Sequence, residues 1–192
     1  MPLKVTFELS DKDLRHFKQV MKEARSKARS RPESKLIKSA KDLLTHVRDG
    51  DLPQFVRERL LQLELMIGML EDEEWDLQGQ DRERVTSALA YFDEPLDLIP
   101  DHVPGFGFLD DAVMVELVVQ ELKHDIEAYQ DFCTYRKAEE KRRGRSDDEV
   151  TRSQWVGAKR KQLHQRMRRR RQARRGRDTS RSRRSRSPFS LW

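Results

Sequence analysis

The chain of 192 residues contains a single cysteine, Cys133, and no run of apolar residues long enough to span a membrane. One thiol cannot form a disulfide framework within the chain, which is typical of proteins in reducing compartments. The most apolar stretch, Leu109 to Leu122, is interrupted by charged side chains and falls short of the roughly 20 residues that a bilayer requires. Met1 to Ser10 shows no secretory signal, so we expect a cytoplasmic protein, with the inner face of a membrane as the alternative location.

Motifs for common enzyme chemistry are also absent from the sequence. There is no nucleophile elbow, no phosphate-binding loop, no zinc-protease helix and no Cys-x-x-Cys pair. We therefore predict a protein that is not an enzyme and that has no cofactor and no catalytic metal.

Four aspartates near the middle of the chain have the chemistry of cation ligands. Asp97, Asp101, Asp110 and Asp111 offer carboxylate oxygens, which hard divalent cations prefer. The same residue type also caps helices and stabilises turns in proline-rich bends. We favour the structural interpretation, in which Asp110 or Asp111 caps the helix that follows.

Two further candidates for chemistry have simpler interpretations. Glu121 and His124 have the Glu-x-x-His spacing of di-iron bundles, but at about 100° per residue both lie far around the helix from its apolar positions. We therefore expect them in solvent. Cys133 lies among the apolar positions, where we expect a buried thiol instead of a nucleophile.

Positive charge is concentrated at the C-terminal end of the sequence. Residues 158–192 contain 15 Lys and Arg and one acid, Asp178, which makes a net charge of +14. Since the whole chain carries +6, residues 1–157 carry −8. An acidic body with a basic tail favours a polyanionic partner for the tail, or a tail that folds back onto the body.

This basic segment is the strongest functional signal. Guanidinium forks match phosphate oxygens, and arginine-rich segments often fold on RNA. Few aromatic residues lie among the cations, so phosphate contacts should dominate over base stacking. We predict a helical scaffold or interaction protein whose tail binds nucleic acid, with RNA favoured. The predicted binding residues are Lys159, Arg160, Lys161, Arg166, Arg168, Arg169, Arg170, Arg171, Arg174, Arg175 and Arg177.

A second hypothesis places the same tail on an anionic membrane surface. Each basic residue near such a surface contributes about 1 kcal/mol, and Phe189, Leu191 and Trp192 add apolar groups at the end of the chain. The length of the arginine run and the lack of an amphipathic apolar face favour nucleic acid. A tail that only solubilises or inhibits the protein is a third alternative. Candidate phosphorylation sites in the tail are Ser180, Ser182, Ser185 and Ser187.

Apolar residues recur at spacings of three and four through most of the chain, which predicts an all-α fold. Ser10 with Asp13, and Ser30 with Glu33, resemble capping boxes at helix starts, and Gly50 is a stop signal. We predict a compact bundle of about five helices, followed by a basic helix and a disordered tail. The expected helices cover residues 10–28, 30–50, 51–70, 85–92, 110–137 and 147–175.

The C-terminal part of the chain is expected to pack poorly. Residues 176–192 are rich in Arg and Ser and have too few apolar side chains for a core. The helix before them has a thin apolar stripe. We therefore predict a helical domain over 1–145, a loosely packed basic helix over 146–175 and a disordered tail over 176–192.

The helix expected over residues 110–137 has the most regular apolar spacing, which includes Val115, Val119, Leu122 and Ile126. A seam of this kind favours packing at about +20° against another helix. The partner is either an internal neighbour or a second subunit, which would make a homodimer.

Prolines and glycines interrupt the helical pattern between the fourth and fifth expected helices. The apolar residues among them predict a buried bend. The ordered residues of this bend are Asp97, Ile99, Pro100, Asp101, Pro104, Gly107, Asp110 and Asp111. Their order resembles the signature of the YkvA-like bacterial family, a domain of unknown function, over roughly residues 85–119. The resemblance implies a structural role for these residues and no known reaction, and many family members look like small membrane-associated proteins.

Overall fold

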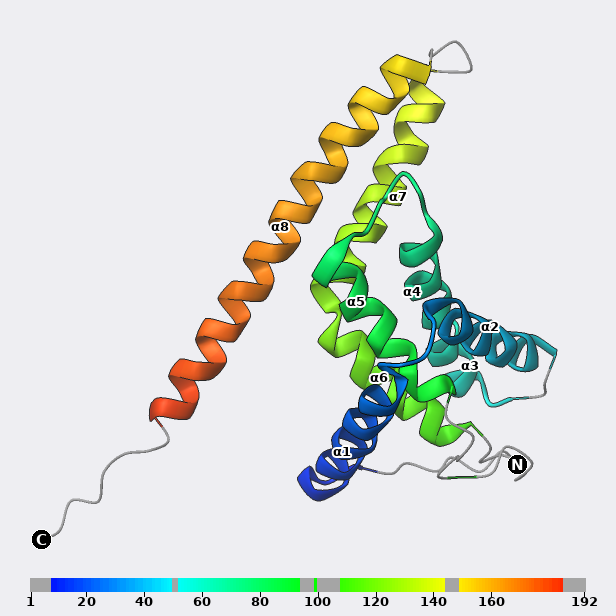
Figure 1. Ribbon diagram of the computed structural model, residues 1–192, viewed down its shortest axis with the longest axis vertical. Coiled ribbons are helices and arrows are strands. Elements are labelled where there is room, and N and C mark those ends of the chain that lie inside the picture. The colour runs from blue at the N-terminus through cyan, green and yellow to red at the C-terminus, as the bar shows by residue number, and fades with distance from the viewer. Residues whose placement is uncertain (1–7, 50–51, 94–98, 100–107, 144–148, 185–192) are drawn as a thin grey trace, which may run out of the picture. The chain divides into compact units, whose positions relative to one another are not determined.

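The computed structural model describes residues 8–49, 52–93, 99, 108–143 and 149–184. Within these ranges all regular structure is helical, which confirms the predicted all-α fold class (Figure 1). The helices form two compact units. The first unit comprises Met1–Glu71 and Leu77–Glu121, and the second comprises Asp72–Asp76 and Leu122–Trp192.

The first unit is a group of short helices around a shared core. Its elements are α1 (Asp11–Ala28), α2 (Glu33–Asp49), α3 (Gln54–Leu60), α4 (Gln62–Glu71), α5 (Gly79–Ala88), the 3-10 helix η1 (Leu89–Asp93) and α6 (Leu109–Glu121). The element η1 packs against α1 and α2, while α6 packs against α3 and α4. Its fully buried side chains include Val47, Leu60, Leu63, Met66, Leu89, Met114 and Val115. These residues come from helices throughout the unit, so its stability depends on tertiary packing more than on any single helix.

The start of α1 agrees with the sequence, whereas the start of α2 does not. Ser10 Oγ accepts a hydrogen bond from the Asp13 amide at 3.3 Å, and the Ser10 amide donates to Asp13 Oδ2 at 2.9 Å. The second expected capping box is wrong. The Ser30 hydroxyl donates back to the Lys27 carbonyl at 3.4 Å, and the Glu33 carboxylate binds Arg82 of α5. A charged partner distant in sequence has replaced the local cap.

Two helices that the sequence predicts as continuous are interrupted. The helix expected over 51–70 is split into α3 and α4 at Leu61, which keeps right-handed angles of φ −61° and ψ −17°. The helix expected over 110–137 ends as α6 at Glu121, and α7 begins at Lys123. Such breaks preserve the apolar spacing of three and four, and for that reason the periodicity does not reveal them.

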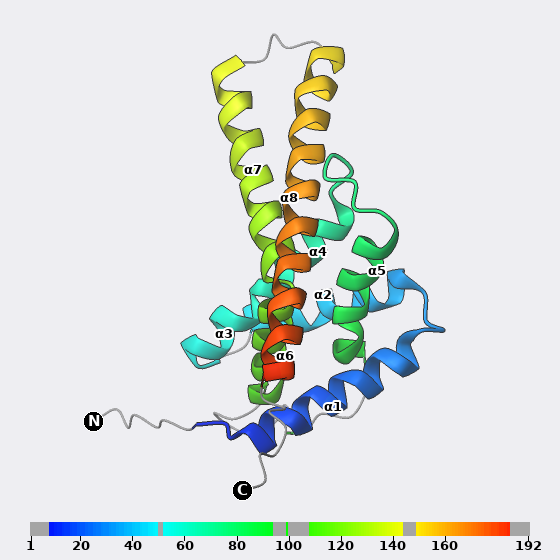
Figure 2. The same cartoon turned by 90° about the vertical axis from the view of Figure 1, so that its left-hand side faces the viewer.

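The second unit is built on a helical hairpin of α7 (Lys123–Arg143) and α8 (Glu149–Arg184), which lie side by side in Figures 1 and 2. The two helices are antiparallel, because residues late in α8 pair with residues early in α7. Trp75, from the Asp72–Asp76 segment, is fully buried in this unit. Its ring centroid lies 5.1 Å from that of Phe132 and 4.3 Å from that of His164.

The expectation of a loosely packed helix that ends near residue 175 is wrong. The helix α8 continues to Arg184, and it buries Val156, Leu163 and Met167. Aromatic residues outside α8 also pack on it, since the Trp75 ring lies 4.3 Å from that of His164 and the Tyr135 ring 5.9 Å from that of Trp155. The apolar stripe of α8 taken alone therefore underestimates its packing. The boundary expected at residue 145 falls inside the second unit. The tail expected over 176–192 lies outside the described residues after Arg184.

Candidate functional site: the basic face of α8

The predicted nucleic-acid-binding residues lie on α8, where they differ in their ion pairs and in their exposure. Four of them make ion pairs with acids of their own unit. The pairs are Arg160 with Asp76 at 3.2 Å, Arg170 with Glu127 at 3.1 Å, Arg171 with Asp125 at 2.7 Å, and Arg166 with Asp131. Arg166, Arg170 and Arg171 join α8 to α7, and Arg160 joins α8 to the Asp72–Asp76 segment. These four side chains therefore contribute less to a binding surface than the sequence suggests.

The pair between Arg171 and Asp125 is the most enclosed of the four. The Asp125 side chain is fully buried, and that of Arg171 is 17% exposed. Removing one partner of such a pair leaves an unpaired charge in a poorly solvated environment, which strongly lowers the stability of the fold. Arg171 therefore fixes the position of α8 along α7, and we no longer count it among the candidate binding residues.

The remaining basic residues differ in exposure. Lys161, Arg168, Arg169, Arg174 and Arg175 are exposed. Lys159 is half-buried, with its ammonium 4.7 Å from the centroid of the Tyr135 ring. The Arg177 side chain lies outside the described residues.

Four of these exposed cations share one side of α8 with exposed glutamines. At about 100° per residue, this side points away from the buried Val156, Leu163 and Met167. The only large exposed apolar side chain of α8 in its described part is Val150, at the N-terminal end. We call this surface the outer face of α8. It consists of Lys161, Arg168, Arg169 and Arg175 together with Gln154, Gln162, Gln165 and Gln172.

A network of charged side chains fixes the other end of the hairpin. Arg136 donates to Asp72 at 2.7 Å and to Glu74 at 2.8 Å, and Arg152 links Glu74 to Glu140 at 2.8 and 2.6 Å. Burial raises the pKa of the Asp72 carboxyl, but the hydrogen bonds from Arg136 and the Trp75 amide outweigh this effect, and the net pKa is lowered. The sequence did not indicate this network, since its members lie up to 80 residues apart.

Two aspartates of the family motif lie in the first turn of α6. Asp110 is buried in the first turn of α6, where its Oδ2 accepts hydrogen bonds from the Tyr91 hydroxyl at 3.1 Å and the Ile99 amide at 3.3 Å. Asp111 is also buried. The expectation that one of them caps the helix is corrected for Asp110, which instead ties η1 and Ile99 to α6. The residue that precedes α6 is Phe108, with a left-handed φ of 62°.

The rest of the motif lies outside the described residues, as does most of the predicted bend. These motif residues are Asp97, Pro100, Asp101, Pro104 and Gly107. Among the residues that are described, no three His, Cys, Asp or Glu side chains gather as a metal site.

The residues weighed for other chemistry lie in ordinary structural environments. Glu121 is half-buried and pairs with Arg25 at 2.9 Å, and His124 is half-buried with Nδ1 3.5 Å from Glu127. The expectation that Glu121 and His124 lie in solvent is therefore wrong. Cys133 is half-buried instead of buried, with Sγ 4.0 Å from Arg136.

The apolar seam is mostly covered within one chain. Val115, Leu122 and Ile126 are buried, while Val119 is half-buried. This burial supports the internal neighbour over the second subunit as the partner of the seam. A homodimer through these residues remains a prediction without added structural support.

Residues 84–117 match a family described as a protein of unknown function, DUF1232. The chain contains a YkvA-like segment. Over 46 residues the chain is 39% identical to the uncharacterized membrane protein YkvA of Bacillus subtilis (strain 168). The match covers 24% of this chain and 43% of that protein, so the chain spans less than half of its relative. No solved structure matches the chain.

The YkvA-like segment corresponds to the end of α5, η1 and most of α6, and it includes the contacts of Asp110 with Tyr91 and Ile99. The outer face of α8 lies outside the matched residues 84–117. In the part of the chain that the structure describes, no helix is both long enough and apolar enough to cross a bilayer.

Proposed function

We propose that this protein is a helical interaction protein that binds nucleic acid, RNA in preference to DNA, through the outer face of α8. The observation that supports the proposal is the exposure of Lys161, Arg168, Arg169 and Arg175 on one side of a packed helix. Phosphate groups along a nucleic-acid strand would neutralise these cations and release counterions. We expect little sequence preference, because phosphate contacts position a protein without reading bases.

The polar residues between the cations favour nucleic acid over a lipid surface. Gln154, Gln162, Gln165 and Gln172 offer donors and acceptors that can bond to sugars and phosphates. An interfacial helix would instead present large apolar side chains for insertion between lipids. RNA is the favoured form because arginine forks suit the irregular backbones of structured RNA.

The internal ion pairs of the hairpin also support binding by a preformed helix. Because Arg166, Arg170 and Arg171 join α8 to α7, a nucleic acid would meet an ordered row of cations. An ordered surface loses less conformational entropy on binding than a disordered tail does. The protein is proposed to have no catalytic activity, since its sequence lacks catalytic motifs.

The proposal is tested by removing the outer-face charges without touching the core. One variant combines Lys161→Gln, Arg168→Gln, Arg169→Gln and Arg175→Gln. The matched control combines Lys123→Gln, Lys137→Gln, Lys141→Gln and Arg142→Gln, which removes the same charge from exposed positions of α7. We expect the outer-face variant to bind a structured RNA more weakly than wild type by at least about tenfold at 50 mM salt, and the control to change little. Equal losses in the two variants would show that net charge, and not this face, governs binding.

An anionic membrane surface is the second candidate, because the relative with 39% identity is called a membrane protein. Competition decides between the two partners. The wild-type protein is mixed with RNA, duplex DNA and vesicles of neutral or anionic lipid, and the bound fractions are compared. Preference for anionic vesicles over RNA, lost in the outer-face variant, would replace the nucleic-acid proposal with peripheral membrane binding.

A further inference from the structure

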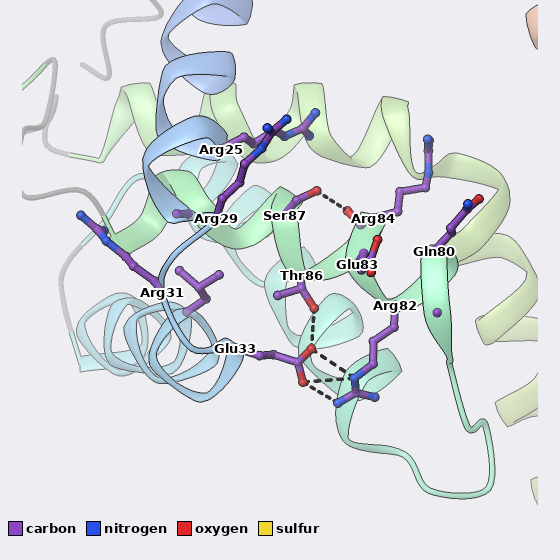
Figure 3. Close-up of a pocket in the computed structure, with 13 residues that line it drawn as sticks. Arg25, Arg29, Arg31, Glu33, Gln80, Arg82, Glu83, Arg84, Thr86 and Ser87 are labelled. Carbon is purple, nitrogen blue, oxygen red and sulfur yellow. Dashed lines mark hydrogen bonds and ion pairs between the residues drawn. The ribbon is translucent and has the colours of Figure 1, made fainter.

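A pocket of about 700 Å³ opens in the first unit between α1, α2 and α5 (Figure 3). Five arginines line it, against two acids, so these charged side chains sum to +3. Two further acids pair with these arginines, Glu121 with Arg25 and Asp93 with Arg31, which lowers the local sum from +3 to +1. Residues 1–157 as a whole carry −8, so this is still a locally positive site in an acidic body. The charged lining residues are Arg25, Arg29, Arg31, Arg82, Arg84 and the acids Glu33 and Glu83.

Four of the five arginines lie on two sides of the pocket, while the fifth, Arg31, pairs with Asp93. On one side, Arg25 of α1 and Arg29, the residue that follows α1, lie together in Figure 3. Arg25 binds both carboxylate oxygens of Glu121 at 3.3 and 2.9 Å, and Arg84 donates to the Glu121 carbonyl at 2.8 Å. On the other side, the guanidinium of Arg82 meets Glu33. An anion with several charged groups could therefore contact both sides.

The contacts of Glu33 show what kind of group this pocket holds. Its carboxylate accepts hydrogen bonds from Arg82 Nε at 3.1 Å and Nη2 at 2.5 Å, and from the Thr86 hydroxyl at 2.8 Å. Burial raises the pKa of Glu33, but these hydrogen bonds more than offset that effect and the net pKa is lowered. A fork and a hydroxyl directed at one ionised group form an oxyanion receptor, which the protein fills with its own carboxylate.

The N-terminal end of α5 adds to the positive character of the pocket. Gly79 and Gln80, at the start of this ten-residue helix, are lining residues. The side chain of the N-cap residue, Gln78, makes no capping hydrogen bond. The positive end of the helix dipole and its first amides favour an anion nearby.

We infer that this pocket binds a small anion with at least two linked phosphate groups. The volume is larger than one phosphate needs and falls in the range of small-molecule sites, about 300 to 1,000 Å³. The pocket has no aromatic side chain among its lining residues, so the phosphate chain and not a base would be recognised. The site belongs to the first unit and does not depend on the function proposed for α8.

The test uses the full chain and inorganic pyrophosphate at low salt, with binding measured by isothermal titration calorimetry. We expect saturable binding with a dissociation constant below about 1 mM. Arg29→Gln should weaken binding at least about fivefold, because Arg29 is an exposed lining cation just after α1 whose loss leaves the Arg82 receptor intact. The matched control is Lys22→Gln, which removes an exposed cation of α1 that does not line the pocket and should change little.

A second variant distinguishes a binding site from a purely structural cluster of charges, because a binding site should gain affinity when its internal carboxylate is neutralised. Glu33→Gln removes the internal competitor and frees the Arg82 fork, so pyrophosphate affinity should rise about tenfold, or 1.4 kcal/mol. Thermal unfolding of each variant is recorded to confirm that it is folded. Absence of saturable pyrophosphate binding, or equal affinity in wild type and Arg29→Gln, would overturn the inference.

Two further measurements identify the source of the phosphates and the independence of the site. Tripolyphosphate in solution is compared with vesicles of an otherwise neutral lipid that contain a multiply phosphorylated inositol lipid. Stronger binding to either one supports the site and identifies the source of the phosphate groups. The outer-face variant of α8 should bind pyrophosphate like wild type. Loss of pyrophosphate binding in that variant would overturn the assignment to this pocket, whereas loss of RNA binding there concerns only the α8 proposal.

Discussion

At the residue scale, Trp75 is the side chain that joins the Asp72–Asp76 segment to the hairpin. Asp72 Oδ1 accepts hydrogen bonds from the Glu74 and Trp75 amides, both at 3.1 Å, which fixes the turn that directs the ring inward. The indole is fully buried, with centroid distances of 5.6 Å to Tyr129 and 5.1 Å to Phe132. Such tilted ring pairs add to the hydrophobic free energy of burial.

We predict that Trp75→Ala lowers the free energy of unfolding of the second unit by about 3 to 5 kcal/mol, because it removes a large fully buried side chain and leaves a cavity. Denaturant unfolding, followed by amide exchange in α7 and α8, measures the change. Gln165→Ala is the control: it is exposed on the same unit and should stay within about 0.5 kcal/mol of wild type. A loss below about 1 kcal/mol for Trp75→Ala would contradict the assigned core.

The Asp72 carboxyl predicts how acid affects the second unit. Its pKa is lower in the folded protein than the ordinary 3.8, despite burial, because Arg136 and the Trp75 amide bind its ionised form. A lowered folded pKa stabilises the fold above the unfolded pKa, and this contribution is lost as the pH falls through the folded pKa. The free energy of unfolding should therefore begin to fall below about pH 5 and continue to fall at lower pH.

We predict that Asp72→Asn unfolds more easily than wild type at pH 7 and that the difference shrinks at pH 3. The asparagine cannot ionise, so it loses the charge-assisted bond to Arg136 at every pH, whereas wild type loses it only in acid. Urea unfolding at both pH values gives the comparison. A difference that stays constant from pH 7 to pH 3 would show that the Asp72 charge does not contribute to stability.

At the element scale, α8 serves two purposes along its length. Its inner side supplies Val156, Leu163 and Met167 to the core, and its outer face presents cations. Deletion of everything after residue 157 would therefore remove buried Leu163 and Met167 as well as charge. Loss of binding in such a truncation would not show which property mattered, which is the reason for testing substitutions on the outer face.

We predict that a chain ending after residue 157 has a less stable second unit, whereas a chain ending after residue 176 keeps most of its stability. The first deletion removes Leu163 and Met167 at a cost of several kcal/mol; the second keeps these residues and the pairs of Arg166, Arg170 and Arg171. Thermal unfolding and amide exchange in α7 measure both. Equal protection of α7 in the two chains would show that the part of α8 after residue 157 is dispensable for packing.

At the scale of the whole molecule, charge distribution governs how strongly the protein responds to salt. From the sequence alone, eleven basic residues between Lys159 and Arg177 are predicted to contact a polyanion. The structure directs four of them to acids of the same unit and places another over a tyrosine ring. Four of the remaining six lie on the outer face, so the number of phosphate contacts there should be small.

We predict that the logarithm of affinity falls with the logarithm of salt concentration at a slope of about −3.6 on duplex DNA and about −2.8 on single strands, if all four outer-face cations contact phosphates. Between 50 and 200 mM salt this is a loss of about 150-fold and about 50-fold. Fluorescence anisotropy over that range measures the slope. A slope near −10 would mean that the internal ion pairs open on binding, and a slope near zero would rule out phosphate contacts.

Short-range features of the sequence were enough to predict the helical class, the cap of α1 at Ser10 and the basic character of α8. These properties depend on residues three or four positions apart, or on composition, and neither requires knowledge of the fold. The resemblance to the YkvA-like family was likewise present in the order of residues around Ile99 and Asp110.

Only the tertiary structure decided which of the charged residues lie at the surface, where a partner can reach them. Arg171 and Lys161 have the same chemistry, yet one meets buried Asp125 and the other faces solvent. Their environments differ because α8 turns one side toward α7. The acids of α7 that the arginines meet are 35 to 46 residues away from them in the chain. The arginine-lined pocket has the same origin: α1 and α5 are far apart in sequence, and packing of the first unit brings their cations to one cavity.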